Sequence, residues 1–360
     1  MALSDGSRAF VERRGAALVV GEDPFRFLGA NTYYCMVYAA HEGLRPHVEE
    51  IFEQMQRLGM AVLRTWAFND GAQQWMSLQR APGVYDEQVL LGLDHVVAMA
   101  SRHGVRLVLT LVNHWEDYGG RDQYVRWSEG AKHPDDFYSD ARCREMYREH
   151  CRRIIGRVNA WTGVVYADDP TIMAWELCNE PRCPTGGVGV LTRWVREMAA
   201  HVHALAPRQL VCTGLEGFFG AHRAAQNPPR WRLGAGTDTE ALHAVDGVDI
   251  VSAHVYPDHW GMSEQETLAW MRAQVDAARA LGKPLVFGEM GKRGEEDERA
   301  QHLERWLGLC AEADAGVSGA MVWSLYHEAY PDYDGFGLYP LRQTHTAEVL
   351  KRWARAISDA

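Results

Sequence analysis

The chain has 360 residues, of which 47% are hydrophobic and 24% charged, which suits one large or two ordinary domains with an ample core. Its net charge of −11 argues against nucleic acid or an anionic membrane as a partner, because those surfaces attract basic patches. No apolar run is long enough to span a bilayer. Seven cysteines, none in a Cys-x-x-Cys pair, indicate reduced, buried thiols rather than a disulfide framework or a zinc site.

The N-terminal part of the sequence predicts a location and a small β-structure. The first residues, MALSDGSRAF, lack the basic and apolar segments of a secretory signal, so the sequence as written predicts a cytoplasmic protein. A secreted protein is expected only if a native signal precedes this chain. Segment 9–27 alternates apolar and polar residues around Gly15 and around the turn at 21–24, which predicts a short β-hairpin.

From residue 27 onward, apolar strand patterns alternate with amphipathic helical patterns. The predicted strands are 27–34, 61–66, 106–112, 172–179, 210–215, 250–256, 284–290 and 319–326. The clearest predicted helices are 48–58, 89–103, 143–161, 191–205, 264–281 and 296–313. Eight strand–helix units without a linker predict a single (β/α)8 TIM barrel over residues 1–360. A doubly wound sheet is the weaker alternative, because no Gly-x-Gly-x-x-Gly turn follows the first strand.

Two of the predicted strands end in a carboxylate. The segment TIMAWELCNEP runs from an apolar strand into Asn179 and Glu180, and Pro181 then stops the hydrogen-bond ladder. The segment KPLVFGEM likewise brings Glu289 to the end of a buried strand. A carboxylate is costly to desolvate unless it has partners or a chemical role. Parallel α/β proteins place their chemistry at this end of the strands, so both glutamates are candidate catalytic residues.

The remaining strand ends supply amides, a cation, imidazoles and aromatic rings. These residues are Asn31, Tyr33, Arg64, Trp66, Asn113, His114, Trp115, Glu216, His254, Tyr256 and Trp323. Such groups at nearly every strand end predict a lined pocket. Two carboxylates converging on one pocket suit glycoside hydrolysis, in which one protonates the leaving oxygen and the other attacks the anomeric carbon or activates water.

The side chains around the two glutamates suggest how their roles divide. Arg64 beside Glu289 would hold that carboxylate ionised, and Tyr256 would donate a hydrogen bond to it. Glu180, facing an anionic Glu289, is expected to have a raised pKa and to stay protonated near neutrality. Asn179 is placed to bind the sugar 2-hydroxyl.

Two further residues have proposed contacts in this pocket. His254 would orient Glu180 or a sugar hydroxyl, although a lone histidine is more often structural. Trp323 would form the floor beneath the sugar ring at the cleavage point, with core packing as the alternative.

The ordered set of motifs resembles a known family. It comprises Arg64 in LRTWAF, Asn179-Glu180-Pro181, His254-Val255-Tyr256 followed by Pro257 and Trp260, Phe287-Gly288-Glu289, and Trp323, with the further stretches GANTYY, LQRAPGVYDEQVLLGLDHVV and WEDYGGRDQYVRW. This set resembles glycoside hydrolase family 5 of clan A, and within it the β-mannanases. The resemblance runs collinearly from about residue 10 to residue 323.

The resemblance implies a retaining double displacement on β-1,4-mannan or manno-oligosaccharides, with Glu180 as acid/base and Glu289 as nucleophile. Retention predicts roughly 5–5.5 Å between the two carboxyl groups. The implied substrate-binding residues are Arg64, Trp66, His114, Trp115, Asn179, His254, Tyr256, Trp260 and Trp323. Glu216 is interpreted as a loop carboxylate rather than a third catalyst.

Two features depart from the mannanase pattern. His114 stands where many mannanases have a second asparagine, and segment 182–190 is rich in Cys and Gly beside Glu180. No cofactor or metal is expected: His201 and His203 lie on a predicted helix, and the 332–335 loop lacks the later glutamate of an EF-hand.

Alternative functions keep the same carboxylates. They are an exo-acting β-mannosidase or transglycosylase, suggested by the missing signal, and a β-1,4-glucanase. A non-catalytic carbohydrate-binding barrel is disfavoured because both glutamates are present. Endo or exo action, the choice between mannose and glucose, the number of subsites and the oligomeric state are left open by the sequence.

Overall fold

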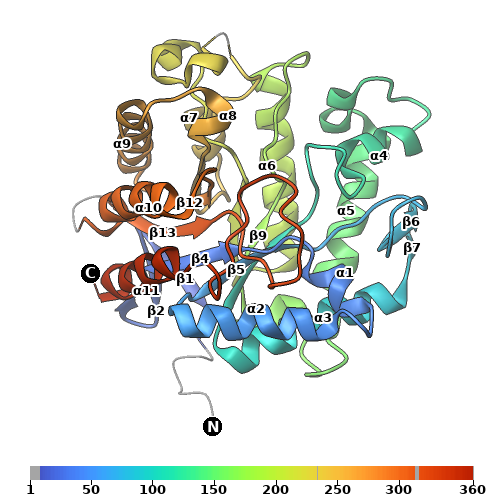
Figure 1. Cartoon of the computed structure of the whole chain (residues 1–360). Coiled ribbons are helices and arrows are strands. Elements are labelled where there is room, and N and C mark those ends of the chain that lie inside the picture. Colours follow the sequence, from blue (N-terminus) through green and yellow to red (C-terminus); the bar gives the residue numbers. More distant parts are fainter. Residues whose placement is uncertain (1–8, 233, 313–315, 360) are drawn as a thin grey trace.

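The computed structural model describes residues 9–232, 234–312 and 316–359 (Figure 1). Its centre is a sheet of parallel strands whose spatial order is β10-β9-β8-β5-β4-β13-β12-β11. A parallel bridge between Cys212 and Ile250 joins the two outer strands and closes the sheet into a barrel. The predicted (β/α)8 barrel is therefore confirmed. The barrel strands are β4 (Phe27–Asn31), β5 (Val62–Trp66), β8 (Arg106–Thr110), β9 (Ile172–Glu176), β10 (Leu210–Cys212), β11 (Val251–Val255), β12 (Leu285–Met290) and β13 (Val317–Val322).

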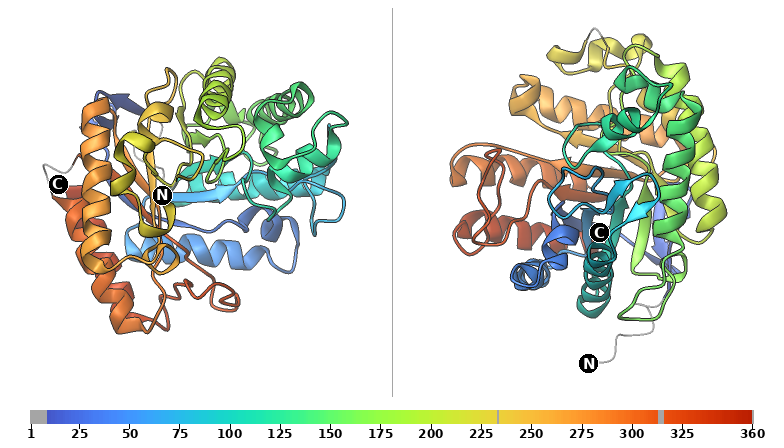
Figure 2. Two further views of the ribbon diagram at one scale, coloured as in Figure 1. Left: turned by 90° about the horizontal axis from the view of Figure 1, so that it is seen from above. Right: turned by 90° about the vertical axis from the view of Figure 1, so that its right-hand side faces the viewer.

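Helices surround these strands, as the views in Figures 1 and 2 show. The α-helices are α1 (Cys35–Ala40), α2 (Arg45–Leu58), α3 (Glu87–His103), α4 (Gly120–Trp127), α5 (Ala141–Ile155), α6 (Val188–Leu205), α7 (Thr239–His243), α8 (Pro257–Trp260), α9 (Glu264–Leu281), α10 (Glu296–Ala311) and α11 (Thr344–Asp359). Short 3₁₀ turns are η2 (Pro134–Tyr138), η3 (Tyr166–Asp168), η4 (Ala221–Gln226) and η5 (Pro229–Trp231). A two-stranded ribbon of β6 (Gln79–Ala81) and β7 (Val84–Tyr85) precedes α3.

Local capping explains where several helices begin and end. The Asp86 side chain accepts a hydrogen bond from the backbone of the first turn of α3, and Gly104 ends that helix at φ 69°. The helix predicted over 143–161 ends earlier, at Ile155, because the chain turns away at Gly156. The predicted end of the sixth helix at residue 313 lies outside the described residues.

The N-terminal segment covers the amino ends of the barrel strands. It forms a three-stranded antiparallel sheet of β1 (Val11–Arg14), β2 (Ala17–Val20) and β3 (Asp23–Pro24), where the sequence predicted a hairpin. Val11 and Leu18 from this sheet share one buried cluster with barrel residues such as Val108 and Met173. The amino end of the barrel is therefore closed by apolar packing, which leaves the carboxyl end for a site.

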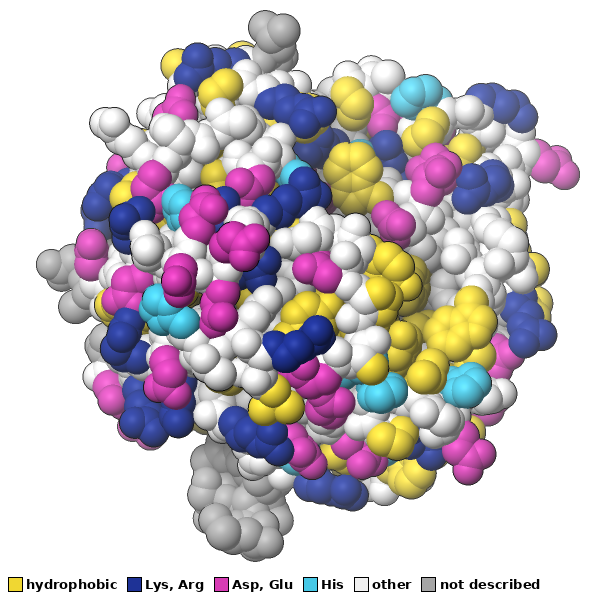
Figure 3. Space-filling model, viewed as in Figure 1, with side chains coloured by type: hydrophobic (Ala, Val, Ile, Leu, Met, Phe, Trp, Pro, Cys, Tyr) yellow, Lys and Arg dark blue, Asp and Glu magenta, His cyan; other side chains and the backbone are white. Residues whose placement is uncertain are grey.

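The surface and the cysteines agree with a globular fold. Acidic and basic side chains are interspersed over the face shown in Figure 3. All seven cysteines lie in the described part of the chain, and each is buried and free. Within the described residues, no helix has both the length and the apolar character needed to traverse a bilayer. The predictions about the first eight residues lie outside the described part of the chain.

Candidate active site

A cavity of about 670 Å³ opens at the carboxyl ends of the barrel strands. The predicted residues that line it are Trp66, Trp115, Asn179, Glu180, Tyr256, Trp260, Glu289 and Trp323. Arg64 and His254 do not line it but contact its two glutamates from below, at 1% and 0% exposure. Residues from six strand–loop junctions therefore meet in one place, because parallel strands bring their carboxyl ends to the same rim.

Glu289, in β12, is surrounded by fixed donors. Its Oε1 accepts a 2.6 Å hydrogen bond from Arg64 Nη1, and its Oε2 accepts a short one from the Tyr256 hydroxyl. His254 Nδ1 lies 3.5 Å from Oε2. Burial raises the pKa of Glu289, and the positive charges of His254 and Arg64 oppose that rise by stabilising the carboxylate.

Arg64, in β5, is held in place by a second carboxylate that the sequence analysis did not single out. Glu176, in β9, accepts hydrogen bonds from both Nε and Nη2 of Arg64, the shortest being 2.6 Å. Thr110 Oγ1 donates to the same carboxylate at 2.9 Å. Because this pairing uses one edge of the guanidinium, Nη1 is left for Glu289.

Glu180 follows β9 and has a different environment. Its backbone has φ 52°, a conformation rare for a residue with a side chain, and its N–H donates to Gly214 O at 2.8 Å. One carboxylate oxygen lies 2.7 Å from His254 Nδ1, and the other accepts a 2.7 Å hydrogen bond from Trp115 Nε1. The strained backbone and these two contacts fix the carboxylate over the cavity.

The structure corrects the predicted ionisation of Glu180. Burial favours the neutral acid, but the hydrogen bond and charge of His254, followed by the charge of Arg182, bring the pKa of Glu180 below its usual range. The prediction of a raised pKa was wrong because it considered only the facing Glu289. Burial disfavours the charged imidazole, yet Glu289 and Glu180 together raise the pKa of His254.

The separation of the carboxylates indicates one type of glycosidase chemistry. Glu180, His254 and Glu289 each offer one atom, and these three atoms lie within 4.8 Å of one another. Inverting glycosidases keep their two carboxylates about 6.5–9.5 Å apart to accommodate a water, whereas retaining enzymes keep them about 5–5.5 Å apart. The observed proximity fits direct attack by one carboxylate on the anomeric carbon.

The comparison with known proteins agrees with this geometry. Residues 8–303 match the family described as GH family 5 beta-mannosidase-like. The chain belongs to glycoside hydrolase family 5. The putative mannan endo-1,4-beta-mannosidase 5 of Oryza sativa subsp. japonica is 41% identical, over 98% of this chain and 78% of that protein. Mannan endo-1,4-beta-mannosidase 7 of Arabidopsis thaliana is 34% identical, over 98% of this chain and 86% of that protein.

Two solved structures of endo-mannanases share this architecture over most of the chain. The endo-beta-1,4-mannanase from Thermotoga petrophila superposes with a TM-score of 0.84 at 34% identity, covering 93% of this chain and 77% of that one. The endo-1,4-beta-mannanase from Rhizomucor miehei gives a TM-score of 0.88 at 28% identity, covering 98% of this chain and 100% of that one.

Beside Glu180, the family 5 site of this chain contains an ion pair that the sequence analysis did not assign. Arg182 makes two 2.6 Å hydrogen bonds to Glu216, and its guanidinium lies 4.1 Å from the ring centre of Trp231. Burial and the charge of Glu180 raise the pKa of Glu216 to about 7, against the effect of Arg182. Glu216 thus holds Arg182 in the wall of the cavity, a role consistent with its interpretation as a loop carboxylate.

Aromatic rings form further parts of the cavity wall. Trp323 stacks on Tyr33 with ring centres 5.8 Å apart and planes 11° apart, and Trp66 lies 5.0 Å from the same tyrosine. Trp323 Nε1 also donates to Asp334 Oδ2 at 3.0 Å. Trp260 packs against Tyr256, which fixes the tyrosine whose hydroxyl contacts Glu289. These flat faces suit the apolar faces of sugar rings.

His114 differs from the other predicted binding residues. It is 6% exposed, does not belong to the cavity lining, and its Nδ1 accepts a 3.3 Å hydrogen bond from the backbone N–H of Arg182. Burial, with the charges of Arg121 and Arg182, lowers the pKa of His114 to about 3, so the ring is neutral. The structure places His114 behind Trp115, where it supports the chain that follows Glu180 rather than facing a substrate.

Proposed function

We propose that this chain is a retaining glycoside hydrolase that cleaves β-1,4-mannosidic bonds within mannan or manno-oligosaccharides. The observation that carries the proposal is the pair of carboxylates, Glu180 and Glu289, that line one cavity and have atoms within 4.8 Å of each other. The choice of sugar is supported by relatives named as mannan endo-1,4-beta-mannosidases, which are 34–41% identical to this chain. Several aromatic rings line the one cavity, among them Trp66, Trp115, Trp260 and Trp323, which supports the binding of more than one sugar unit and so endo action.

In the first step, an oxygen of Glu289 attacks the anomeric carbon. The bond from that carbon to the leaving oxygen breaks, and Glu180 gives its proton to the leaving oxygen. A covalent glycosyl ester on Glu289 and a shortened sugar chain result. In the second step, Glu180 takes a proton from water, the water oxygen attacks the anomeric carbon, and Glu289 leaves as the carboxylate.

The proton for the first step comes from the His254–Glu180 hydrogen bond. His254 Nδ1 lies 2.7 Å from Glu180 Oε1, and the raised pKa of His254 with the lowered pKa of Glu180 favours a proton on the imidazole, facing the carboxylate. Transfer of that proton to Oε1 produces the neutral acid without exchange with solvent. An incoming sugar favours this transfer because it excludes water from the site and so destabilises the separated charges.

Asn179 has capacity left for a sugar hydroxyl. Its Oδ1 accepts from Arg64 at 2.6 Å, and one N–H of its amide donates to Asn113 Oδ1 at 3.0 Å. The second N–H of the same amide remains for the 2-hydroxyl of the sugar, a contact that strengthens in the oxocarbenium-like transition state.

A product profile tests the proposal. Mannohexaose and cellohexaose are each incubated with the protein, and the products are separated over time. A mixture of mannobiose, mannotriose and mannotetraose, with cellohexaose left nearly intact, is expected, and NMR should show the first-formed reducing end as the β-anomer. Mannose as the sole early product would overturn endo action, and faster cleavage of cellohexaose would overturn the choice of sugar. Glu289→Gln is the matched control for contaminating hydrolases.

A further inference from the structure

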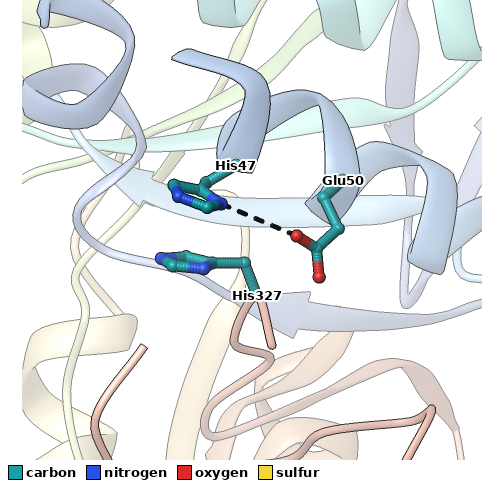
Figure 4. A group of neighbouring side chains, drawn as sticks. All are labelled: His47, Glu50 and His327. Carbon is teal, nitrogen blue, oxygen red and sulfur yellow. Dashed lines mark ion pairs between the residues drawn. The ribbon is translucent and has the colours of Figure 1, made fainter. Parts of the chain in front are cut away.

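A second group of metal-ligand side chains lies between α2 and the loop that follows β13 (Figure 4). His47 and Glu50 come from α2, and His327 comes from the loop. One atom from each residue lies within 4.8 Å of the atoms of the other two. None of the three lines the catalytic cavity, so this group is separate from the site already described.

Hydrogen bonds to one carboxylate oxygen of Glu50 orient the side chain, and the other oxygen faces His47. Its Oε1 accepts hydrogen bonds from Gln54 Nε2 at 3.0 Å and from the backbone N–H of Glu328 at 2.8 Å. Its Oε2 faces His47 Nδ1 at 3.7 Å, which is too long for a hydrogen bond. Metal-binding carboxylates are commonly fixed in this way, with outer hydrogen bonds on one oxygen and the ion on the other.

The imidazole of His327 is buried but has few hydrogen-bond partners. His327 is 2% exposed, its Nε2 has no hydrogen-bond partner among the described residues, and its Nδ1 accepts only a 3.3 Å contact from Ala329 N. A buried polar atom without a partner costs free energy. The ring of His47 stacks over that of His327 with centres 3.9 Å apart and planes 14° apart, as Figure 4 shows.

We propose that His47, Glu50 and His327 bind a divalent transition-metal ion of the zinc class, with water as the fourth ligand. Two imidazoles and one carboxylate are a zinc donor set, whereas calcium and magnesium prefer oxygen ligands alone. Imidazole lone pairs lie in the ring plane, so His47 must tilt out of its stack to share an ion with His327. Its side chain is 32% exposed, which leaves space for that movement and a path for the ion.

Such an ion has a structural consequence near the cavity. It would join α2 to the loop after β13. In that loop Tyr330 exchanges a 2.7 Å hydrogen bond with the Tyr33 hydroxyl, and Tyr33 carries the stacked ring of Trp323. The site therefore fastens the loop that supports the aromatic wall of the cavity, without touching either glutamate.

Another cluster in the described chain provides a matched control. His222, Asp238 and Glu240 also offer atoms within 4.8 Å, but His222 already contacts Glu240 directly, and Asp238 caps the first turn of α7. All three residues lie in the segment between β10 and β11, so an ion bound there would not link parts of the chain that are distant in sequence.

Calorimetric titration of the whole, EDTA-stripped chain with ZnCl2 tests the proposal, alongside thermal unfolding and the visible spectrum with Co²⁺. We expect one Zn²⁺ per chain, a tetrahedral-type Co²⁺ spectrum, and a Tm rise of about 3–4 °C at a hundredfold excess over Kd. His47→Gln and Glu50→Gln should each weaken Zn²⁺ binding at least about tenfold, because even an outer-shell change costs that much. His222→Gln should leave binding unchanged.

Several outcomes would overturn the proposal. They are no binding at millimolar Zn²⁺, wild-type binding by His47→Gln, loss of binding in His222→Gln, or an equal Tm rise with Mg²⁺. Binding in the catalytic cavity would survive His47→Gln and would inhibit hydrolysis, so it also counts against the site. Both test residues lie on the surface of α2, and circular dichroism of each variant verifies that it folds.

Discussion

The ends of β12 and β9 each present a glutamate to the same cavity, yet they hold it in opposite ways. Glu289 is paired with Arg64, whose charge does not titrate in proteins, and with the Tyr256 hydroxyl. Glu180 is paired with His254, whose imidazole can gain or lose a proton and whose pKa is raised by the two glutamates, and with Trp115 Nε1. A nucleophile needs a partner that keeps it charged, whereas an acid/base needs one with which it can exchange a proton.

The largest expected effect is the loss of kcat/KM on replacing either glutamate, and substrates with different leaving groups should distinguish the two losses. Glu289→Gln removes the atom that forms the covalent intermediate, so kcat/KM should fall about 10⁴-fold or more on every substrate. Glu180→Gln should lower kcat/KM on mannohexaose about 10²–10⁴-fold. For an aryl β-mannoside whose leaving group needs no proton, Glu180→Gln should slow the first step much less.

Steady-state and pre-steady-state rates on both substrates measure this difference. Glu53→Gln on α2, with a side chain 54% exposed, is the matched control and should be near wild type. Equal losses for the two active-site variants on the aryl substrate would contradict the division of roles.

The second prediction concerns the titratable partner of Glu180. The pKa of His254 is raised above its ordinary value of 6.5, so the shared proton is retained through pH 6.5 and lost only as pH rises through the higher value. The basic limb of kcat/KM should therefore lie above pH 6.5 in the wild type. In His254→Asn it should move to lower pH, with about tenfold or greater loss at pH 7.5, because Glu180 then holds the proton alone.

A pH–rate profile of both proteins checks this shift, with His201→Asn on α6 as the control histidine. A basic limb that stays in place in His254→Asn would show that His254 only packs beneath the carboxylates.

The smallest expected effect comes from the second donor to Glu180. Trp115→Phe keeps an aromatic ring but removes the N–H that donates to the carboxylate at 2.7 Å. Because this donor stabilises the charged form, its loss should raise the pKa of Glu180 and change kcat/KM by less than about tenfold. The basic limb of the pH profile, which follows the proton of Glu180, should move upward, while Trp75→Phe at an exposed position leaves it unchanged. A loss beyond a hundredfold would mean that Trp115 also carries the substrate.

The sequence made the positions of both glutamates predictable because each follows a continuous apolar run that must be a buried strand. Glu176 was missed for the same reason, since it lies inside such a run and looked like part of the strand. The signal was present, because a charge in the middle of MAWELC needs a buried partner. The sequence did not show that this partner is Arg64, which lies 112 residues away in the chain.

The ionisation of the site was less predictable than its composition. The sequence placed His254 and both glutamates at strand ends of a predicted barrel, but not the distances between their side chains. Only the folded structure shows that His254 Nδ1 lies 2.7 Å from Glu180 and 3.5 Å from Glu289. Coulombic effects change steeply over such distances, so the direction of the Glu180 pKa shift reversed.

The barrel and its eight units, the two carboxylates and most of the cavity lining followed from the sequence alone, because burial periodicity and strand termination are local properties of the chain. Tertiary structure alone decided which donor each carboxylate received, that Arg182 is tied to Glu216, and that His47 and Glu50 meet His327. Those pairings join residues tens to hundreds of positions apart. They depend on how side chains from distant segments pack together in the closed barrel, which no single stretch of sequence contains.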